Sequence, residues 1–97
     1  MAKFHFIRKA VEDLTDIWHY TLETWSEKQA DKYYNLLISA CGELAKKPSL
    51  GWKYEIVAAG LLGYKSGEHI IFYSIVSRNE IEVVRILHGR MDLKGQL

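Results

Sequence analysis

The spacing of apolar side chains divides the chain into segments with different periods. Residues 3–7 alternate between apolar and polar, with Phe4 and Phe6 on one side, which predicts a short β-strand. From about residue 9 to residue 25 the apolar positions recur every three or four residues, which predicts an amphipathic helix. The buried stripe expected for this helix is Val11, Leu14, Trp18, Leu22 and Trp25.

A second helix is predicted directly after the first. Ser26 precedes Gln29 by three residues, which is the spacing of a capping box that begins a helix, and Pro48 ends it. Because a single capping residue separates the two helices, we expect them to fold back on each other as an antiparallel hairpin. The buried stripe expected for the second helix is Ala30, Tyr33, Leu37, Cys41 and Leu44.

The remainder of the chain has the pattern of a connection followed by strands. Residues 49–60 include two glycines and show no regular period, so we expect a long connection there. Beyond it, runs of β-branched and aromatic residues predict strands at residues 61–65, 69–76 and 81–87. The element order β-α-α-β-β-β indicates an α+β fold, in which an antiparallel helix hairpin packs on a small, mostly antiparallel sheet.

A two-residue loop at Arg78 and Asn79 is expected to join the last two strands and to fix their register. The cross-strand pairs are then Tyr73 with Val84, Phe72 with Arg85, and His69 with His88. One face of this hairpin is suited to covering by the helices and holds Ile71, Tyr73, Ile75, Val84 and Ile86. The opposite face holds Arg85 among Ile70, Phe72, Val83 and Leu87. That face is too apolar to lie against solvent, so we expect a further segment to cover it.

Composition and charge narrow the class of protein. The chain has 97 residues, of which 48% are hydrophobic and 26% charged, as expected for one small domain spanning residues 1–97. The formal net charge of +1 gives no general attraction to nucleic acid or to an anionic membrane. Cys41 is the single cysteine, which excludes an intrachain disulfide, and no spacing of ligand residues indicates a metal site. No apolar run is long enough for a membrane span or a secretion signal, so we expect a cytoplasmic protein.

Three stretches carry a resemblance to a known family. They are DLTDIWHYTLETWSEKQADKYY at residues 13–34, GYKSGEHIIFY at residues 63–73 and VVRILHGRMDL at residues 83–93. Together with the element order, they resemble the RelE/ParE superfamily of bacterial type II toxins, and the ParE branch in particular. The resemblance covers nearly the whole chain and implies a toxin that binds and inhibits DNA gyrase, takes part in plasmid stabilisation and uses no cofactor. It also implies a cognate ParD-like antitoxin, and it gives no reason to expect sequence-specific binding of nucleic acid.

The related RelE branch implies an alternative, a ribosome-dependent mRNA endoribonuclease. Such cleavage needs an acid, a base and cations around the phosphate. Leu61 and Leu62 stand where RelE-like sequences carry lysines, His69 stands where they carry an arginine, and Arg90 matches a further arginine of that branch. The catalytic candidates of this alternative are therefore His69, His88 and Arg90, whereas the ParE interpretation needs no catalytic residue and leaves the histidines as a cross-strand pair. A degenerate toxin that only binds antitoxin is a third hypothesis.

Exposed aromatic and basic residues are the candidates for binding a partner protein. Arg85 lies inside an apolar strand, so it must pair with Asp92 or the chain terminus, or with an acidic residue of the antitoxin. The residues predicted to bind the antitoxin are Arg85, Tyr20 and Trp52. In ParE-like toxins the C-terminal segment is tied to toxicity. By this resemblance, the tail after Gly89 is expected to bind gyrase through Arg90, Met91 and Lys94.

Overall fold

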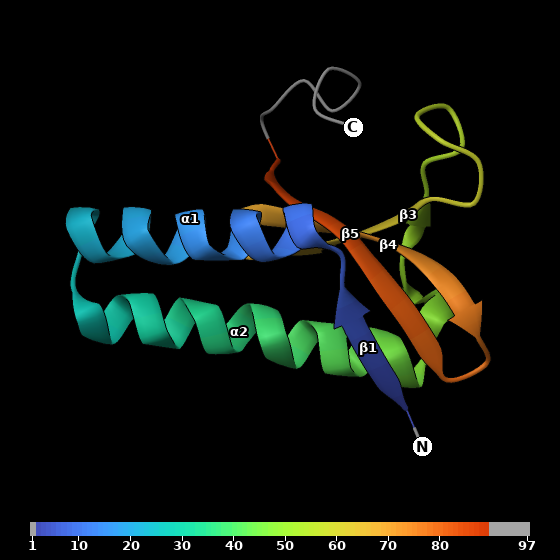
Figure 1. The fold of residues 1–97 in the computed structure, drawn as a ribbon, viewed down its shortest axis with the longest axis horizontal. Coiled ribbons are helices and arrows are strands. Elements are labelled where there is room, and N and C mark those ends of the chain that lie inside the picture. Colours follow the sequence, from blue (N-terminus) through green and yellow to red (C-terminus); the bar gives the residue numbers. More distant parts are fainter. Residues whose placement is uncertain (1, 90–97) are drawn as a thin grey trace.

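The computed structural model describes residues 2–89, in which a helix hairpin packs on a five-stranded sheet (Figure 1). Its elements are β1 (Lys3–Phe6), α1 (Arg8–Thr24), α2 (Glu27–Lys46), the 3-10 helix η1 (Pro48–Leu50), β2 (Trp52–Lys53), β3 (Leu62–Ser66), β4 (His69–Ser77) and β5 (Glu80–His88). The strands lie in the order β1-β5-β4-β3-β2, with β1 parallel to β5 and the other neighbours antiparallel. The α+β class and the element order are confirmed, while η1 and β2 appear inside the segment predicted to be an irregular connection.

The helix hairpin forms for the reason that the sequence indicated. The Ser26 hydroxyl accepts a hydrogen bond from the backbone N–H of Gln29 at 3.1 Å, and this cap begins α2. The indole N–H of Trp18 donates to the Asp31 carboxylate at 3.0 Å and so joins the two helices. Burial raises the pKa of the Cys41 thiol to about 12, as expected for a small core residue. The predicted stripe of α2 faces the core, with Tyr33 half-buried against it and these residues buried: Ala30, Leu37, Cys41 and Leu44.

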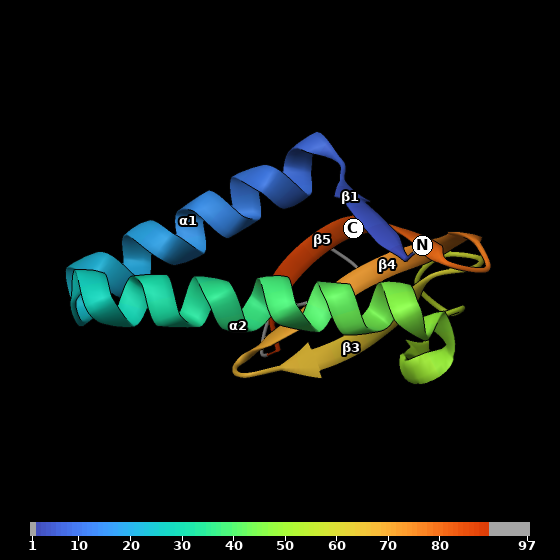
Figure 2. The ribbon, with the colours of Figure 1, turned by 90° about the horizontal axis from the view of Figure 1, so that it is seen from below.

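The first helix buries a different stripe from the one predicted. Ala10 and Leu14 are buried, and Ile17 packs partly buried against the same core. Val11 and Trp25 were expected in the core, but they are 48% and 72% exposed, so the prediction was wrong for both. Trp25 follows the last residue of α1 at the tip of the hairpin, and Figure 2 shows this tip extending beyond the sheet, where no strand covers it.

A register shift divides the hairpin of β4 and β5. Two predicted cross-strand pairs are confirmed, namely His69–His88 and Phe72–Arg85. Tyr73, however, pairs with Val83 instead of Val84, because the register shifts between Phe72 and Tyr73. The shift places Val83 in the core under the helices and Val84 on the opposite face, which reverses the prediction for both residues. Ile75 lies beside a second shift and is 49% exposed, so its predicted place under the helices was also wrong.

The opposite face of the sheet is covered by the segment between β2 and β3. Tyr54, Val57 and Leu61 of this segment pack against Phe72 and Leu87. The rings of Tyr54 and Phe72 meet edge to face, with their centroids 5.2 Å apart. The expectation that something covers this apolar face is therefore confirmed, and the cover is an irregular segment.

Asp13 on α1 binds β5 through the side chain of Arg85. Its carboxylate oxygens lie 2.7 Å from Nε and 2.9 Å from Nη2 of Arg85, and they also accept the backbone N–H of Ile86 at 3.0 Å. Both side chains of the pair are 14% exposed. The hydrogen bond to Asp13 raises the pKa of Arg85 above its ordinary value. Arg85 therefore has an acidic partner on α1, whereas the predicted partner Asp92 lies outside the described residues.

We expect Asp13→Asn to lower the free energy of unfolding by about 2–4 kcal/mol, because it leaves a mostly buried guanidinium facing a neutral amide. Glu12→Gln is the matched control, since Glu12 pairs with Arg8 on the same helix with side chains 62% and 94% exposed. That control is expected to cost about 0.5 kcal/mol or less. Urea denaturation followed by circular dichroism measures both variants. Equal losses would show that the Asp13 pair does not stabilise the attachment of α1.

Candidate functional site

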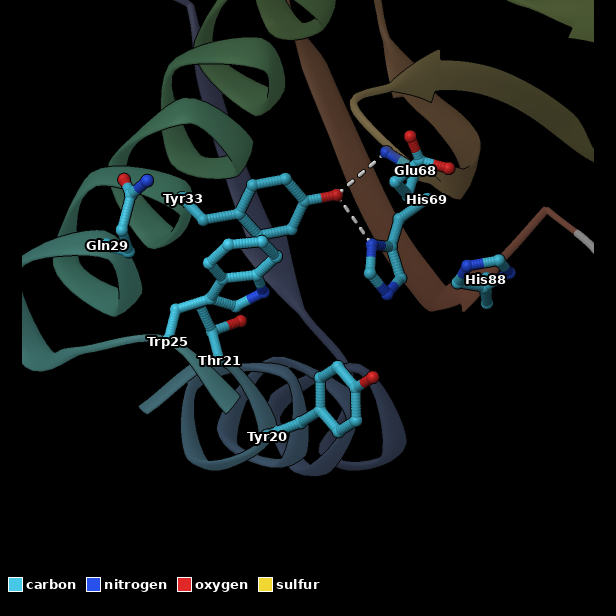
Figure 3. A pocket seen from close by; sticks show the side chains of 8 residues that line it. All are labelled: Tyr20, Thr21, Trp25, Gln29, Tyr33, Glu68, His69 and His88. Carbon is cyan, nitrogen blue, oxygen red and sulfur yellow. Dashed lines mark hydrogen bonds between the residues drawn. The ribbon is translucent and has the colours of Figure 1, made fainter. Parts of the chain in front are cut away.

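A cleft of about 360 Å³ opens where the tip of the helix hairpin meets the turn between β3 and β4 (Figure 3). The lining comes from three parts of the chain: α1 with the residue after it, α2, and the strands with their turn. Aromatic and imidazole rings make up most of it. The lining residues are Tyr20, Thr21, Trp25, Gln29, Tyr33, Glu68, His69 and His88.

Tyr33 joins α2 to the turn between β3 and β4. Its hydroxyl oxygen accepts the backbone N–H of Glu68 at 2.9 Å and lies 2.6 Å from Nδ1 of His69. Gly67 permits this close approach, because a Cβ at that position would lie 2.6 Å from the Tyr33 oxygen. The φ of Gly67 is +60°, a conformation that glycine adopts without strain. Tyr33 therefore fixes the position of His69 at the wall of the cleft.

The surroundings of His69 favour its neutral imidazole form. Burial lowers the pKa of His69 below its ordinary value, and the neighbouring His88 lowers it further. The Tyr33 oxygen already accepts from Glu68, so we assign the tyrosine proton to the bond with Nδ1 of His69. The ring proton is then on Nε2, and Figure 3 shows this end of the ring pointing away from Tyr33, along the cleft. The Nε2–H of His69 is thus an N–H donor that lies among aromatic rings.

The two histidines lie side by side, as the predicted register requires. The ring centroids of His69 and His88 are 5.4 Å apart, and the ring planes meet at 77°. Leu61 is buried and Leu62 half-buried, at the positions where a RelE-like nuclease would carry ammonium groups. No lysine or arginine within residues 2–89 lines the cleft, and the third catalytic candidate, Arg90, lies outside those residues. Within the described chain, the cleft therefore lacks the cations that phosphodiester cleavage needs.

The predicted antitoxin-binding residues do not gather at one place. Tyr20 is 69% exposed and lines the cleft, whereas Trp52 is 76% exposed on β2, the edge strand at one end of the sheet. Arg85 is bound to Asp13 of the same chain. The residues predicted to bind gyrase lie outside the described part of the chain and are Arg90, Met91 and Lys94.

Sequence patterns alone singled out three of the eight lining residues and missed the other five, namely Thr21, Trp25, Gln29, Tyr33 and Glu68. Helical spacing assigns Trp25 and Tyr33 to the core, because both continue an apolar stripe. The position of Trp25 directly before the Ser26 cap could have indicated that Trp25 is exposed. A residue beside a cap that joins two helices lies at the tip of their hairpin, where the sheet gives little cover.

The side chains within residues 2–89 limit the kinds of ligand that this part of the chain could bind. Within residues 2–89 no group of three or more His, Cys, Asp or Glu side chains could hold a metal ion. In the same part of the chain no helix has the length and apolar character needed to cross a membrane. The cleft offers aromatic rings and the imidazole of His69, with Glu68 of the turn at its edge (Figure 3).

A family model and relatives of known family match this sequence over most of its length. Residues 5–93 match the family model for the ParE toxin of the type II toxin–antitoxin system parDE. Toxin ParE1 of Caulobacter vibrioides is 33% identical over 97 residues, which cover 100% of this chain and 99% of that protein. Toxin ParE1 of Mycobacterium tuberculosis is 33% identical over 84 residues, which cover 87% of this chain and 86% of that protein.

A solved structure, the chromosomal ParDE TA system from P. aeruginosa, shares the fold. Its matching chain superposes with a TM-score of 0.76 and 18% sequence identity, over 91% of this chain and 96% of that one. The fold likeness, the family model and the two relatives agree with the resemblance seen in the sequence. This chain belongs to the ParE toxin family of type II toxin–antitoxin systems.

Proposed function

We propose that this ParE-family toxin binds and inhibits DNA gyrase in the cytoplasm and is neutralised by a ParD-like antitoxin. The observation that carries the proposal is the 33% identity to Toxin ParE1 of C. vibrioides along 100% of the chain. The parDE system named by the family model supports an antitoxin of the ParD type. In this proposal residues 1–97 form one toxin domain with a short tail from about residue 89, and the system contributes to plasmid stabilisation.

The chemistry of the cleft supports action by binding rather than by catalysis. Stabilising the charge on a phosphate that is being cleaved requires cations placed around it. Leu61 and Leu62 supply none, and among residues 2–89 neither lysine nor arginine lines the cleft. A toxin that acts by binding a protein needs only a complementary surface. The ribonuclease is therefore the second candidate, with His69, His88 and Arg90 in the catalytic roles.

The proposed contact surfaces follow the exposed aromatic residues and the tail. Tyr20 and Trp52 are largely exposed, and tyrosine and tryptophan are enriched among residues that dominate binding energy at protein interfaces. We assign these two residues, together with Arg85, to the antitoxin. The tail residues assigned to gyrase are Arg90, Met91 and Lys94.

Purified toxin is expected to inhibit the supercoiling of relaxed plasmid by gyrase and to leave mRNA intact on translating ribosomes. Changing both Arg90 and Lys94 to alanine should weaken inhibition by more than roughly tenfold, because both cations are assigned to the gyrase contact. Lys65→Ala, an exposed lysine on β3, is the matched control and should inhibit like the unmodified toxin. A supercoiling assay and toeprinting of a translated message, run on one preparation, measure the two activities.

Cleavage within codons in the ribosomal A site, with supercoiling unaffected, would reverse the proposal and turn His69, His88 and Arg90 into catalytic residues. Inactivity in both assays with antitoxin binding retained would identify a degenerate toxin.

Tyr20→Ala is expected to weaken antitoxin binding by roughly tenfold, the effect of removing a moderate interface anchor. Arg85 needs a different design, because a single substitution also breaks its bond to Asp13. Exchanging the two residues, with Asp13→Arg and Arg85→Asp together, keeps an ion pair while reversing the charge on β5. The exchange should weaken binding by more than roughly 30-fold if Arg85 pairs with an acidic antitoxin residue.

Isothermal titration calorimetry with purified antitoxin measures these affinities, and circular dichroism checks that each variant is folded. Ile56→Ala, which removes an apolar side chain that is 82% exposed, is the control. Unchanged affinity in the Tyr20 variant and in the exchanged pair would remove both residues from the antitoxin surface.

A further inference from the structure

The cleft at the hairpin tip presents aromatic side chains to solvent. Trp25 is 72% exposed and Tyr20 is 69% exposed, and both line the cleft together with the half-buried Tyr33. Figure 3 shows Trp25, Tyr33, His69 and Tyr20 around one open space. Exposed tryptophan and tyrosine are the side chains that most often anchor protein interfaces. The arrangement is therefore a pocket ready to receive a ligand group, and neither core packing nor catalysis explains it.

The charge of the lining selects the kind of group. The faces of aromatic rings carry partial negative charge. Figure 3 shows the Glu68 side chain directed away from Trp25 and Tyr20, so the rings are the groups that would contact a cation. No lysine or arginine in residues 2–89 lines the cleft, so phosphate and carboxylate groups would find no counter-charge there. A cation is favoured instead. A guanidinium suits the site better than an ammonium, because it is planar, stacks on aromatic rings and is more weakly hydrated.

The polar groups of the cleft point to a peptide as the carrier of that cation. The Nε2–H of His69 is a donor that fits a carbonyl oxygen, because Nδ1 is already engaged by Tyr33. The side-chain amide of Gln29, which is exposed at the cleft, can both donate to and accept from a peptide group. A volume of about 360 Å³ lies near the lower end of ligand pockets, which suits one side chain and its peptide link.

We propose that this cleft is an anchor site for an arginine side chain carried by a polypeptide partner. The guanidinium lies against Trp25 and Tyr20, and His69 donates to a backbone carbonyl beside the arginine. The proposal goes beyond the assignment of a toxin target and does not rest on it, because it concerns the chemistry of the recognised group.

The test is an NMR titration of the full chain with arginine capped as its N-acetyl and N-methylamide derivative. Saturable shifts are expected at the Trp25 indole and the Gln29 side-chain amide. The citrulline derivative, which has the same shape without the charge, should bind more weakly. Trp25→Ala should weaken binding by roughly 3- to 30-fold, as expected for loss of a cation–π contact.

Tyr34→Ala is the matched control, because Tyr34 is an aromatic residue on α2 that is 39% exposed and does not line the cleft. It should leave the affinity unchanged, and circular dichroism should show every variant folded. Absence of saturable shifts up to about 50 mM, where fragment-sized binding is detectable, would overturn the proposal. Equal binding of the citrulline derivative would overturn the preference for a cation. Tighter binding of free arginine than of the capped form would overturn the polypeptide source and indicate a free amino acid.

Discussion

One carboxylate adds three hydrogen bonds to the hydrophobic contacts that attach the helix hairpin to the sheet. Asp13 holds the guanidinium of Arg85 and the backbone N–H of Ile86 together, so α1 is bound to the side chain and to the main chain of β5. Because β5 lies between β1 and β4, this bond also fixes the helices relative to both neighbouring strands. The cleft at the hairpin tip requires that placement, since Tyr20 comes from α1 and His69 from β4.

Features set by neighbouring residues could be predicted from the sequence. The Ser26 cap, the apolar stripe of α2 and the pairing of His69 with His88 each follow from spacing within one segment or across one short loop. Helix periodicity and loop length are local rules, and they need no knowledge of what packs on the segment. The order of elements and three sequence stretches were likewise enough to indicate the family.

Features set by distant parts of the chain could not be predicted in this way. Asp13 and Arg85 are 72 positions apart, and no local pattern marks their partnership. The register shift beside Tyr73 exchanges the faces of Val83 and Val84, since a shift of one residue turns each side chain to the other side. For the candidate site, the exposure of Tyr20 and the histidine pair were foreseen, whereas Trp25 was placed in the core. Its exposure depends on where the sheet ends, which the period of a helix does not specify.

The pairing of β1 with β5 has a consequence for the order of events during synthesis. These strands lie near opposite ends of the chain, and His5 on β1 bonds Glu82 on β5 across 77 positions. A contact between such distant residues requires closure of a long loop, and it cannot form before β5 has been synthesised. While the ribosome is still adding β5, the helix hairpin has already emerged, but Asp13 has neither Arg85 nor Ile86 to bind. The folded cleft can therefore form only after β5 has left the ribosome, because His88 of β5 lines it. A nascent chain that lacks β5 cannot present this cleft to a partner.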